Sequence, residues 1–481
     1  MEKVSQSFVE SGRQLLSDKA WARWTALALV ASMMLFAYMF VDVMSPLQSL
    51  IQTQRGWSPD AFGYYAGAEY ILNVFGFLIL AGIILDKMGV RFTGTLSASL
   101  MVLGAVIKLY AISDAFQGTG LNEWLSSWWT VMPGSAKLAA LGFMIFGCGC
   151  EMAGITVSKT LAKWFEGKEM ALAMGLEMAI ARIGVFFIFT ISPRLADSVV
   201  PASVVVPVAF CTALLCIGLL AFIVFTFMDA KLDREMGATK VAEAESDEEF
   251  KLSDVGAIFG SKLFWIIALL CVLYYSAIFP FQRYAANMLQ CNLGISETQA
   301  SDIFRWFPVG AAILTPFLGY FLDRKGKGAS MLILGAILMI VCHLTFAFVV
   351  PATQSELITY SAIVVLGVSF SLVPAALWPS VPKIMDKRFL GSAYSLIFWV
   401  QNIGLAFVPI IIGKVITWSN PGVTDPLQYD YTMPMCCFAA LGVLALIFGI
   451  ILKSMNAVYH YGLEEPNIKA DFEDVRIDGE A

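Results

Sequence analysis

The chain has 481 residues, of which 58% are apolar and 14% are charged, and its mean hydropathy is +0.75. A typical soluble domain is about 45–50% apolar and about 25% charged. Because the apolar residues also form long runs, this composition excludes a soluble protein and predicts an integral membrane protein. The net charge of −6 arises mainly from two acidic segments, 242–250 and the tail from Glu464 onward. An acidic surface argues against a nucleic-acid partner and against a basic lipid anchor.

The first 21 residues are predicted to form a cytosolic leader. The stretch "VSQSFVESGRQLLSDKAWARW" can form an amphipathic helix on the inner membrane surface, or it can simply be solvated, and both alternatives stay open. The first apolar run begins near Thr25 and continues for about 20 residues, which is too long for the apolar part of a cleavable signal. We therefore expect this run to be the first membrane span.

Apolar runs of about 20 residues, the length that crosses a bilayer, occur twelve times along the chain. They are expected at 22–44, 62–86, 92–114, 136–162, 169–192, 202–228, 262–286, 300–322, 328–350, 357–382, 388–416 and 433–455. The predicted fold class is an all-α membrane protein with twelve spans in two pseudo-symmetric six-helix bundles, 22–228 and 262–455. An acidic cytosolic linker, 229–261, separates the bundles, and an acidic cytosolic tail, 456–481, follows them.

The distribution of basic residues between alternate loops predicts the orientation of the chain. One set of short loops holds Lys87, Arg91, Lys163, Lys168, Arg324, Lys325, Lys327, Lys383, Lys387 and Arg388. The other set offers mainly Arg55, Lys137, Arg194 and Arg283. Loops rich in Lys and Arg stay on the cytosolic side, so both termini are expected in the cytosol.

One loop motif occurs in both halves, as "GIILDKMGVR" (82–91) and "GYFLDRKGKG" (319–328). Its glycines allow helix ends to approach closely, and its charged residues can form a network with a neighbouring helix end that closes the cytosolic side. One such loop satisfies the loop-charge bias by itself, but two copies, with Asp86 and Asp323 237 positions apart, are more specific. Repeated halves are typical of alternating-access transporters with a site at the membrane midplane. The expected gating residues are Gly82, Asp86, Gly89, Arg91, Asp323 and Arg324.

Glu151 is an acid inside an uncharged run of membrane length, "FGCGCEMAG", where a charge must be compensated. Spans four and five share the loop 163–168, and Glu151 and Arg182 lie roughly 22 and 25 Å from its centre at about 1.5 Å per residue. Both are thus expected near the middle of a ~30 Å core, where Arg182 is the only convincing cation. They can form an ion pair that joins the helices, or they can flank a zwitterion, with Glu151 on its ammonium and Arg182 on its carboxylate. Both arrangements can hold at different stages of a cycle.

Several other polar residues fall at membrane depth. Glu69 and Asn73 are four residues apart and therefore share one helix face. Glu177 lies one and a half turns from Arg182 and is expected to point elsewhere, and His343 is expected to be packed rather than to relay protons. The remaining candidates for lining a cavity, each of which could instead satisfy a neighbouring backbone group, are Asp42, Glu69, Gln401 and Asn402.

Aromatic residues gather at two proline-containing stretches of the second half, "LYYSAIFPF" (273–281) and "ALWPSVP" (376–382). Proline frees backbone groups and permits a kink in a membrane helix. Aromatic residues at helical spacing usually pack in a core, but beside such breaks they are candidates for a pocket or a gate. The candidates are Tyr274, Tyr275, Phe281 and Trp378.

Catalytic and metal-binding patterns are scarce. The chain has two histidines and nine scattered cysteines, without a C-x-x-C pair, an H-E-x-x-H motif or a G-x-S-x-G motif. We therefore expect neither an enzyme nor a metal or cofactor site. A non-transporting receptor with a transporter fold is not separated from a transporter by these residues.

Three segments carry a closer resemblance. The stretches "WFEGKEMALAMGLEMAIARIG" (164–184), "YYSAIFPF" (274–281) and "LWPSVP", with the region up to residue 406, resemble the major facilitator superfamily domain-containing protein 1 group, and the repeated loop resembles the superfamily's signature loop. Animal members of that group are lysosomal dipeptide transporters. The resemblance implies passive uniport of dipeptides, with an acid on span four and an arginine on span five holding the peptide termini. These positions match Glu151 and Arg182.

The chain departs from the group in ways that bear on its location and partners. It has no acidic dileucine signal around Leu15 and no Asn-x-Ser/Thr sequon, so a bacterial cytoplasmic membrane is expected, with a lysosomal membrane as the alternative. Glu69 does not match the group's second span, which leaves a proton-coupling site open. A monomer is expected, and an accessory single-span subunit is possible but not implied.

We therefore expect a transporter of dipeptides or similar zwitterions that works as a uniporter. The alternatives within transport are a proton-coupled symporter and an exchanger of small organic anions or amino acids. The chain lacks the E-x-x-E-R motif on span one that proton-coupled peptide transporters usually carry. An anion exchanger would need more cations around its site than Arg182 alone.

Overall fold

The computed structural model of the chain describes residues 15–166, 168–236, 255–385 and 390–466, and within these ranges every regular element is helical. The first half contains η1 (Leu16–Asp18), α2 (Ala20–Asp42), η2 (Ser45–Leu47), α3 (Gln48–Arg55), α4 (Pro59–Val74), α5 (Phe77–Ile112), α6 (Asp114–Gln117), α7 (Gly120–Ser127), α8 (Gly134–Phe165), α9 (Met170–Ala196) and α10 (Val205–Met236). The second half contains α11 (Val255–Phe259), α12 (Lys262–Leu293), α13 (Glu297–Phe304), α14 (Trp306–Lys325), α15 (Gly328–Leu344), η4 (Thr345–Val349), α16 (Val350–Thr353), α17 (Glu356–Ile384), α18 (Leu390–Ser419) and α19 (Thr432–Tyr459).

Among the described residues, eleven helices are long and apolar enough to cross a membrane. One of them, α5, contains Gly89 with the non-helical angles φ +75° and ψ 171°, which glycine adopts without the steric penalty of a Cβ. Gly89 divides α5 into 77–88 and 90–112. The first part completes the span that α4 begins, and the second part is a span of its own, so the fold provides the twelve predicted crossings.

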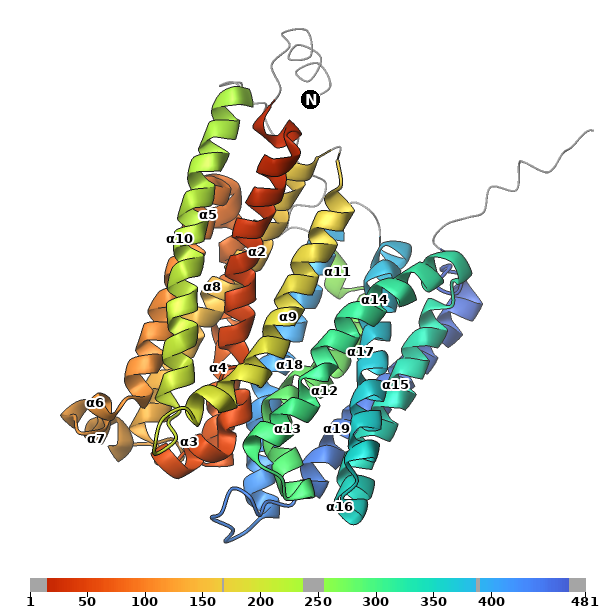
Figure 1. Cartoon of the computed structure of the whole chain (residues 1–481). Coiled ribbons are helices and arrows are strands. Elements are labelled where there is room, and N and C mark those ends of the chain that lie inside the picture. Colours follow the sequence, from red (N-terminus) through yellow and green to blue (C-terminus); the bar gives the residue numbers. More distant parts are fainter. Residues whose placement is uncertain (1–14, 167, 237–254, 386–389, 467–481) are drawn as a thin grey trace, which may run out of the picture.

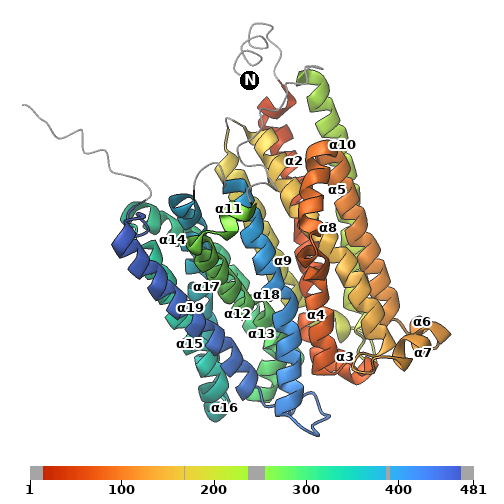
Figure 2. The ribbon, with the colours of Figure 1, turned by 180° about the vertical axis from the view of Figure 1, so that it is seen from behind.

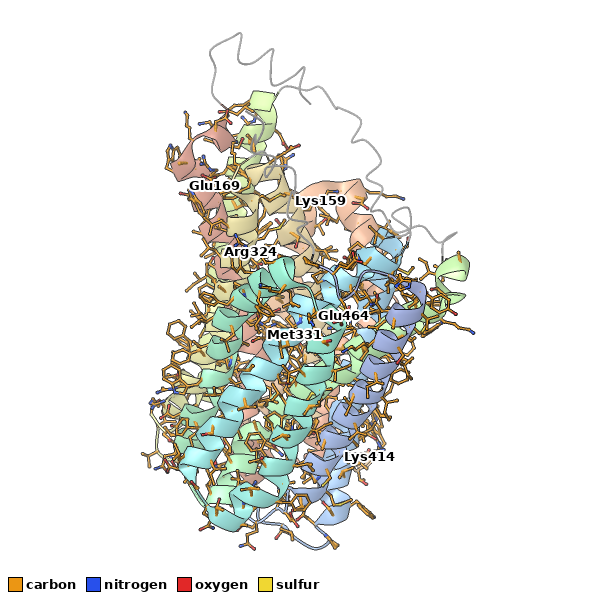
Figure 3. All side chains as sticks on the ribbon, turned by 90° about the vertical axis from the view of Figure 1, so that its right-hand side faces the viewer. Lys159, Glu169, Arg324, Met331, Lys414 and Glu464 are labelled. Carbon is orange, nitrogen blue, oxygen red and sulfur yellow. The ribbon has the colours of Figure 1, made fainter. Side chains whose placement is uncertain are left out.

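The elements form two bundles, which Figures 1 and 2 show side by side. The N-terminal bundle comprises η1 to α10, and the C-terminal bundle comprises α11 to α19. We call the end where α2 begins and α19 ends the terminal face, and the end with α3, α7 and α13 the far face; they lie at the top and bottom of Figure 1. In Figure 3, Glu169 lies near the terminal face and Lys414 near the far face.

Helix α4 and helix α18 hold the two bundles close together. A Cβ on Gly63 of α4 would lie 2.5 Å from the carbonyl oxygen of Pro409, and a Cβ on Gly67 would collide with the carbonyl oxygen of Ala406. Small residues at such positions let membrane helices pack backbone to backbone. Trp399 of α18 also donates a hydrogen bond of 2.7 Å to the carbonyl of Val74, at the end of α4.

Further hydrogen bonds close the far face between the bundles. Ser49 donates to Gln290 at 3.1 Å and to Glu297 at 2.9 Å. Arg194 pairs with Asp302 at 2.7 Å. Near the terminal face, ion pairs join helices within one bundle, for example Arg23 with Glu169 at 2.9 Å. The structure is therefore closed on its far side.

The segments outside the spans partly take up regular structure. Helix α10 continues to Met236 and α11 begins at Val255, so both ends of the predicted linker are helical, and residues 237–254 lie outside the described residues. Beyond α19, Glu464 accepts hydrogen bonds of 2.8 Å from the amide and the hydroxyl of Ser330 at the start of α15 (Figure 3 labels Glu464 beside Met331). The first seven residues after α19, 460–466, are therefore attached to the C-terminal bundle. Most of the predicted leader, 1–14, and the rest of the tail, 467–481, lie outside the described residues.

Candidate substrate site

Glu151 on α8 and Arg182 on α9 are both half-buried. Among the described residues, neither side chain forms an ion pair or a hydrogen bond. The guanidinium carbon of Arg182 instead lies 5.5 Å from the ring centre of Phe279 and 5.4 Å from that of Phe370. Both rings belong to the C-terminal bundle, so Arg182 faces the boundary between the bundles. In this conformation Glu151 and Arg182 do not form the ion pair that was one of the two alternatives left open by the sequence.

The side of α8 that carries Glu151 is open toward the terminal face. Residues 151, 154 and 158 share one helix face because they are three and four positions apart. A Cβ on Gly154 would meet nothing within 4 Å, and Ser158 is exposed. One turn in the opposite direction, Gly147 lies directly against the backbone of Glu69. Since an unpaired charge at membrane depth is costly in lipid, this open side of α8 is a candidate wall of a substrate path.

Tyr38 of α2 lies near the ionic groups. Its half-buried side chain interacts electrostatically with Arg182, Glu151 and Glu177. The expectation that Glu177 points away from Arg182 stays a prediction. Sequence reasoning missed Tyr38, whose only signal is a phenol in the middle of the otherwise apolar "MMLFAYMF".

Aromatic residues of the C-terminal bundle form the wall opposite Arg182. Tyr275 stacks on Phe279 with ring centres 5.6 Å apart and interacts electrostatically with Arg182. Trp378 of α17 donates a hydrogen bond of 3.2 Å to the hydroxyl of Tyr275. The structure therefore brings two of the four predicted aromatic residues, Tyr275 and Trp378, to the boundary that Arg182 faces.

The other two aromatic candidates lie elsewhere. Tyr274 is fully buried and donates to the carbonyl of Leu332, and Phe281 is fully buried beside His343 and Phe438. Residues 274 and 281 are seven positions apart and share one face of α12, whereas 275 and 279 share another. The first face turns into the C-terminal bundle, so Tyr274 and Phe281 belong to its core. His343 is packed there, as expected.

Gln401 and Asn402 also do not reach the two ionic groups. Gln401 accepts a contact of 3.2 Å from the thiol of Cys271 on α12, and Asn402 donates a hydrogen bond of 3.0 Å to the carbonyl of Phe398 in its own helix. Both contacts lie within the C-terminal bundle, and only that of Asn402 is made to a backbone group; among the described residues the buried side-chain oxygen of Asn402 has no hydrogen-bond partner.

Asp42 and Glu69 bind a cation that the sequence placed in a loop. Arg283 is buried on α12, and its two terminal nitrogens lie 3.2 Å from an Asp42 oxygen and 2.5 Å from a Glu69 oxygen. Gln282 donates a further hydrogen bond of 2.6 Å to Asp42. The expectation of an outer-loop Arg283 is therefore wrong, because α12 extends to Leu293. The three charges form a bridge between the bundles on the far side of Glu151.

A second unexpected cation lies beside this bridge. Lys108 of α5 is fully buried, and among the described residues its ammonium nitrogen has no hydrogen-bond partner. The nitrogen lies 4.1 Å from the ring centre of Phe40 and 4.7 Å from that of Phe143, positions that stabilise a cation through the ring faces. Arg182 is therefore not the only cation at membrane depth, although it is the one that faces the open side of α8.

The described residues contain no cluster of three or more His, Cys, Asp or Glu side chains that would hold a metal ion.

Comparison with known proteins decides the family of the chain. The model of the Major Facilitator Superfamily matches residues 30–289 and 284–469. The chain belongs to the Major Facilitator Superfamily. It is a transporter rather than an enzyme.

Several curated relatives within this superfamily match most of the chain. The lysosomal dipeptide transporter MFSD1 of Danio rerio is 28% identical over 425 residues, which cover 85% of this chain and 83% of the relative. Its counterpart in Bos taurus is 27% identical over 369 residues, or 74% and 70% of the two chains. The resemblance to this group that the motifs indicated is thus present along most of the sequence.

Solved structures of the same superfamily share the fold at lower identity. The nucleoside transporter NupG superimposes with a TM-score of 0.70 at 14% identity, covering 89% of this chain and 99% of that protein. A D-xylose-proton symporter gives 0.67 at 16% identity, with 90% and 97% covered. A bacterial homologue of the human lysosomal transporter Spinster, in an inward-facing and occupied conformation, also gives 0.67 at 14% identity, with 89% and 96% covered.

The superfamily loop of the first half forms ion pairs at the terminal face. Asp86 lies 2.9 Å from the ammonium of Lys159 on α8, and Arg91 lies 3.0 Å from Asp233 on α10. These contacts stay within the N-terminal bundle. Gly82 and Gly89 have open space around their Cα atoms.

The second copy of the loop makes different contacts. The guanidinium carbon of Arg324 lies 4.7 Å from the ring centre of Tyr320, and Asp323 interacts electrostatically with Lys383 at the end of α17. Both copies therefore contact helix ends of their own bundle.

Proposed function

We propose that this protein carries dipeptides across the membrane as a uniporter by alternating access. The observation that carries the proposal is the pair of unpaired, half-exposed charges, Glu151 and Arg182, on the open side of the N-terminal bundle. A dipeptide carries an ammonium at one end and a carboxylate at the other, so it supplies the partner that each charge lacks. Arg182 matches a carboxylate through its planar fork of donors, and Tyr38 interacts electrostatically with both charges.

The aromatic wall of the C-terminal bundle would contact the side chains of the peptide. Tyr275, Phe279 and Trp378 offer ring faces and edges to apolar or aromatic groups, without a pocket that requires one particular shape. This supports a broad range of dipeptides. The animal relatives are named lysosomal dipeptide transporters, which supports the same substrate class.

The direct test is uptake of labelled dialanine into proteoliposomes. We expect accumulation up to, but not beyond, the outside concentration, together with a rise in the melting temperature of the purified protein in the presence of dipeptides, because a ligand that binds only the folded state stabilises it. Free alanine serves as the comparison, since its two charges are closer together than those of a dipeptide. Absence of both uptake and stabilisation across a dipeptide library would contradict the proposal.

Uniport is tested separately from substrate choice. If no ion is coupled, the pH inside the proteoliposomes changes only by the titration of the peptide itself. Acidification that scales with uptake and disappears in Glu69→Gln would favour the alternative of a proton-coupled symporter. The neutralisation of Arg283 by two carboxylates argues against an exchanger of organic anions, because it leaves Arg182 as the exposed cation of the described site.

We further propose a monomer in a bacterial cytoplasmic membrane, with the terminal face in the cytosol and the two loop motifs acting in gating. The basic loops of the terminal face support this orientation through the preference of Lys and Arg for the cytosolic side. A cysteine placed at the exposed Lys414, near the far face, should react with an impermeant maleimide in intact cells, whereas one at Glu166 should react only after lysis.

A further inference from the structure

Arg283 occupies a site in which all the acceptors of its hydrogen bonds belong to the opposite bundle. Its guanidinium belongs to α12, whereas its acceptors are the Asp42 carboxylate at 3.2 Å, the Glu69 carboxylate at 2.5 Å and the carbonyl oxygen of Val41. The hydroxyl of Ser45 donates to the same Asp42 carboxylate at 3.0 Å. The N-terminal bundle therefore presents a buried cradle of oxygen atoms, which Arg283 enters as a cation supplied by the other bundle.

Opening of the far face must empty this cradle. The bridge lies among the contacts between the bundles, such as those of Ser49 with Gln290 and Glu297, all of which separate when α12 moves away from α2 and α4. Asp42 and Glu69 then stay behind without Arg283. Two carboxylates in a low-dielectric site repel each other, so a cation must replace the guanidinium or one carboxylate must lose its charge.

The charges of the neighbouring groups determine the net charge that remains around Glu69 when Arg283 withdraws. The titratable groups that interact with Glu69 are Arg283, Asp42, Glu151, Lys108, Tyr65, Tyr70 and Cys150. Of these, Lys108 is the remaining cation of the N-terminal bundle, and Glu151 faces the open side of α8. With Lys108 charged, the cluster of Asp42, Glu69, Lys108 and Arg283 is neutral when the far face is closed. Withdrawal of Arg283 leaves a net charge of −1.

We infer that opening of the far face takes up one proton from the far side, which binds the Asp42–Glu69 pair in the place of Arg283. The inference depends on the alternating opening contained in the proposed function. When Arg283 returns, the proton leaves a carboxylate oxygen for the water of the same side. No net proton crosses the membrane, and uniport is retained. Acid on the far side therefore favours the open form without driving the peptide.

The test measures the opening itself rather than transport. Spin labels are attached at Thr53→Cys and Leu427→Cys, two exposed positions on the far ends of the two bundles, in a chain whose exposed native thiol is removed by Cys216→Ser. Double electron–electron resonance is then recorded in lipid nanodiscs with saturating dialanine at a series of pH values. It gives the populations of long and short distances between the two labels. We expect the ratio of long to short to rise up to tenfold for each pH unit of acidification, the slope for one linked proton.

Matched variants locate the proton. In Glu69→Gln the carboxylate charge of residue 69 is absent, so the long distance between the labels should dominate. The dependence of the ratio on pH should then fall to zero. Ser49→Ala removes a contact between the bundles without removing a charge, so the ratio should shift and the slope should remain. Glu297→Gln removes a half-buried carboxylate at the far face, and here too the slope should remain. Arg283→Lys, which keeps the cation, should retain both distances and the slope.

Three results would overturn the inference. One is a ratio that does not change with pH while both distances are present. Another is a slope that survives Glu69→Gln or is lost in Glu297→Gln. The third is a ratio that follows the sodium concentration at constant pH, which would assign the cradle to a metal cation instead. The dialanine uptake assay is read independently, so a failure of the substrate assignment is distinguished from a failure of this proton site.

Discussion

Arg182 of α9 lies with its guanidinium carbon 5.5 Å from the ring centre of Phe279 of α12, across the boundary between the two bundles. The ring face stabilises the cation without using its hydrogen-bond donors. The donors therefore remain available to a carboxylate that enters from the open side. This relationship makes Arg182 the most sensitive position of the proposed site.

Replacement of Arg182 by Lys should weaken dipeptide binding although the charge is kept, because Lys cannot present two parallel donors to a carboxylate. A hydrogen bond to a charged group contributes about 1.5–3 kcal/mol, so we expect a loss in affinity of about 10–100-fold. Thermal shift against dialanine measures the affinity. Lys414→Gln, a change of an exposed cation near the far face, should bind like the native chain, and native-like binding by Arg182→Lys would contradict the site.

Glu151 is expected to bind the ammonium end, so the ammonium itself can be removed as a test. N-acetyl-dialanine should bind the native chain at least about tenfold more weakly than dialanine, since a charge-assisted hydrogen bond is lost. In Glu151→Gln the two ligands should become nearly equal, because the carboxylate that distinguishes them is gone. Calorimetry on the purified proteins measures both. An unchanged preference for dialanine in Glu151→Gln would assign the ammonium to another acid, such as Glu177.

Gly67 should be the most restrictive glycine between the bundles. In Gly67→Ala the new methyl group collides with the carbonyl of Ala406, and overpacking of this kind costs about 1–3 kcal/mol. We expect a lower melting temperature in detergent and weaker closure of the far face. Gly154→Ala is the matched control, because its methyl group enters open space and replaces glycine within a helix. If Gly67→Ala and Gly154→Ala had equal melting temperatures, α4 and α18 would be farther apart than the contact of Gly67 with Ala406 requires.

The contact between α2 and α9 at the terminal face should depend on pH. Arg23 donates hydrogen bonds of 3.1 and 2.9 Å to the two carboxylate oxygens of Glu169, and this contact lowers the pKa of Glu169 below its ordinary value. A lowered pKa means that the contact is present at neutral pH and is lost as the pH falls through that pKa. The melting temperatures of the native chain and Glu169→Gln should therefore differ at pH 7 and converge in acid. A constant difference across the range would exclude the titration of Glu169 as its cause.

Asp86 should affect the rate of transport more than the binding of substrate. Its ion pair with Lys159 holds the first superfamily loop against α8, far from Arg182 along the helices. We expect Asp86→Asn to lower the initial rate of dialanine uptake several-fold while the thermal shift with dialanine stays within error of the native value. Equal losses of rate and affinity would mean that the loop shapes the site rather than the gate.

Much of the fold and part of the site could be predicted from the sequence. The twelve spans follow from the lengths of the apolar runs, because these lengths are local. The common depth of Glu151 and Arg182, inferred from the rise of a helix, stays a prediction. The sequence left open whether these two charges pair with each other. The structure answers this for one conformation, in which they are apart.

What the sequence could not provide was the rotation of each helix about its own axis. Tyr274 and Tyr275 are neighbours of similar chemistry, yet one packs in the C-terminal bundle and the other faces Arg182. Tyr38 joins Arg182, Glu151 and Glu177 for the same reason. Which face of an apolar helix turns toward the cavity depends on the helices that pack around it, and an all-round apolar helix carries little periodic signal of its own.

The amino-acid sequence by itself determined that this is a membrane protein of two repeated halves, because hydropathy and repeated loops are properties of short stretches. The tertiary structure alone decided the partners of its buried charges. Arg283 meets Asp42 and Glu69 from 241 and 214 positions away along the chain. Such a contact depends on how two separate bundles close on each other, which no local pattern of residues encodes.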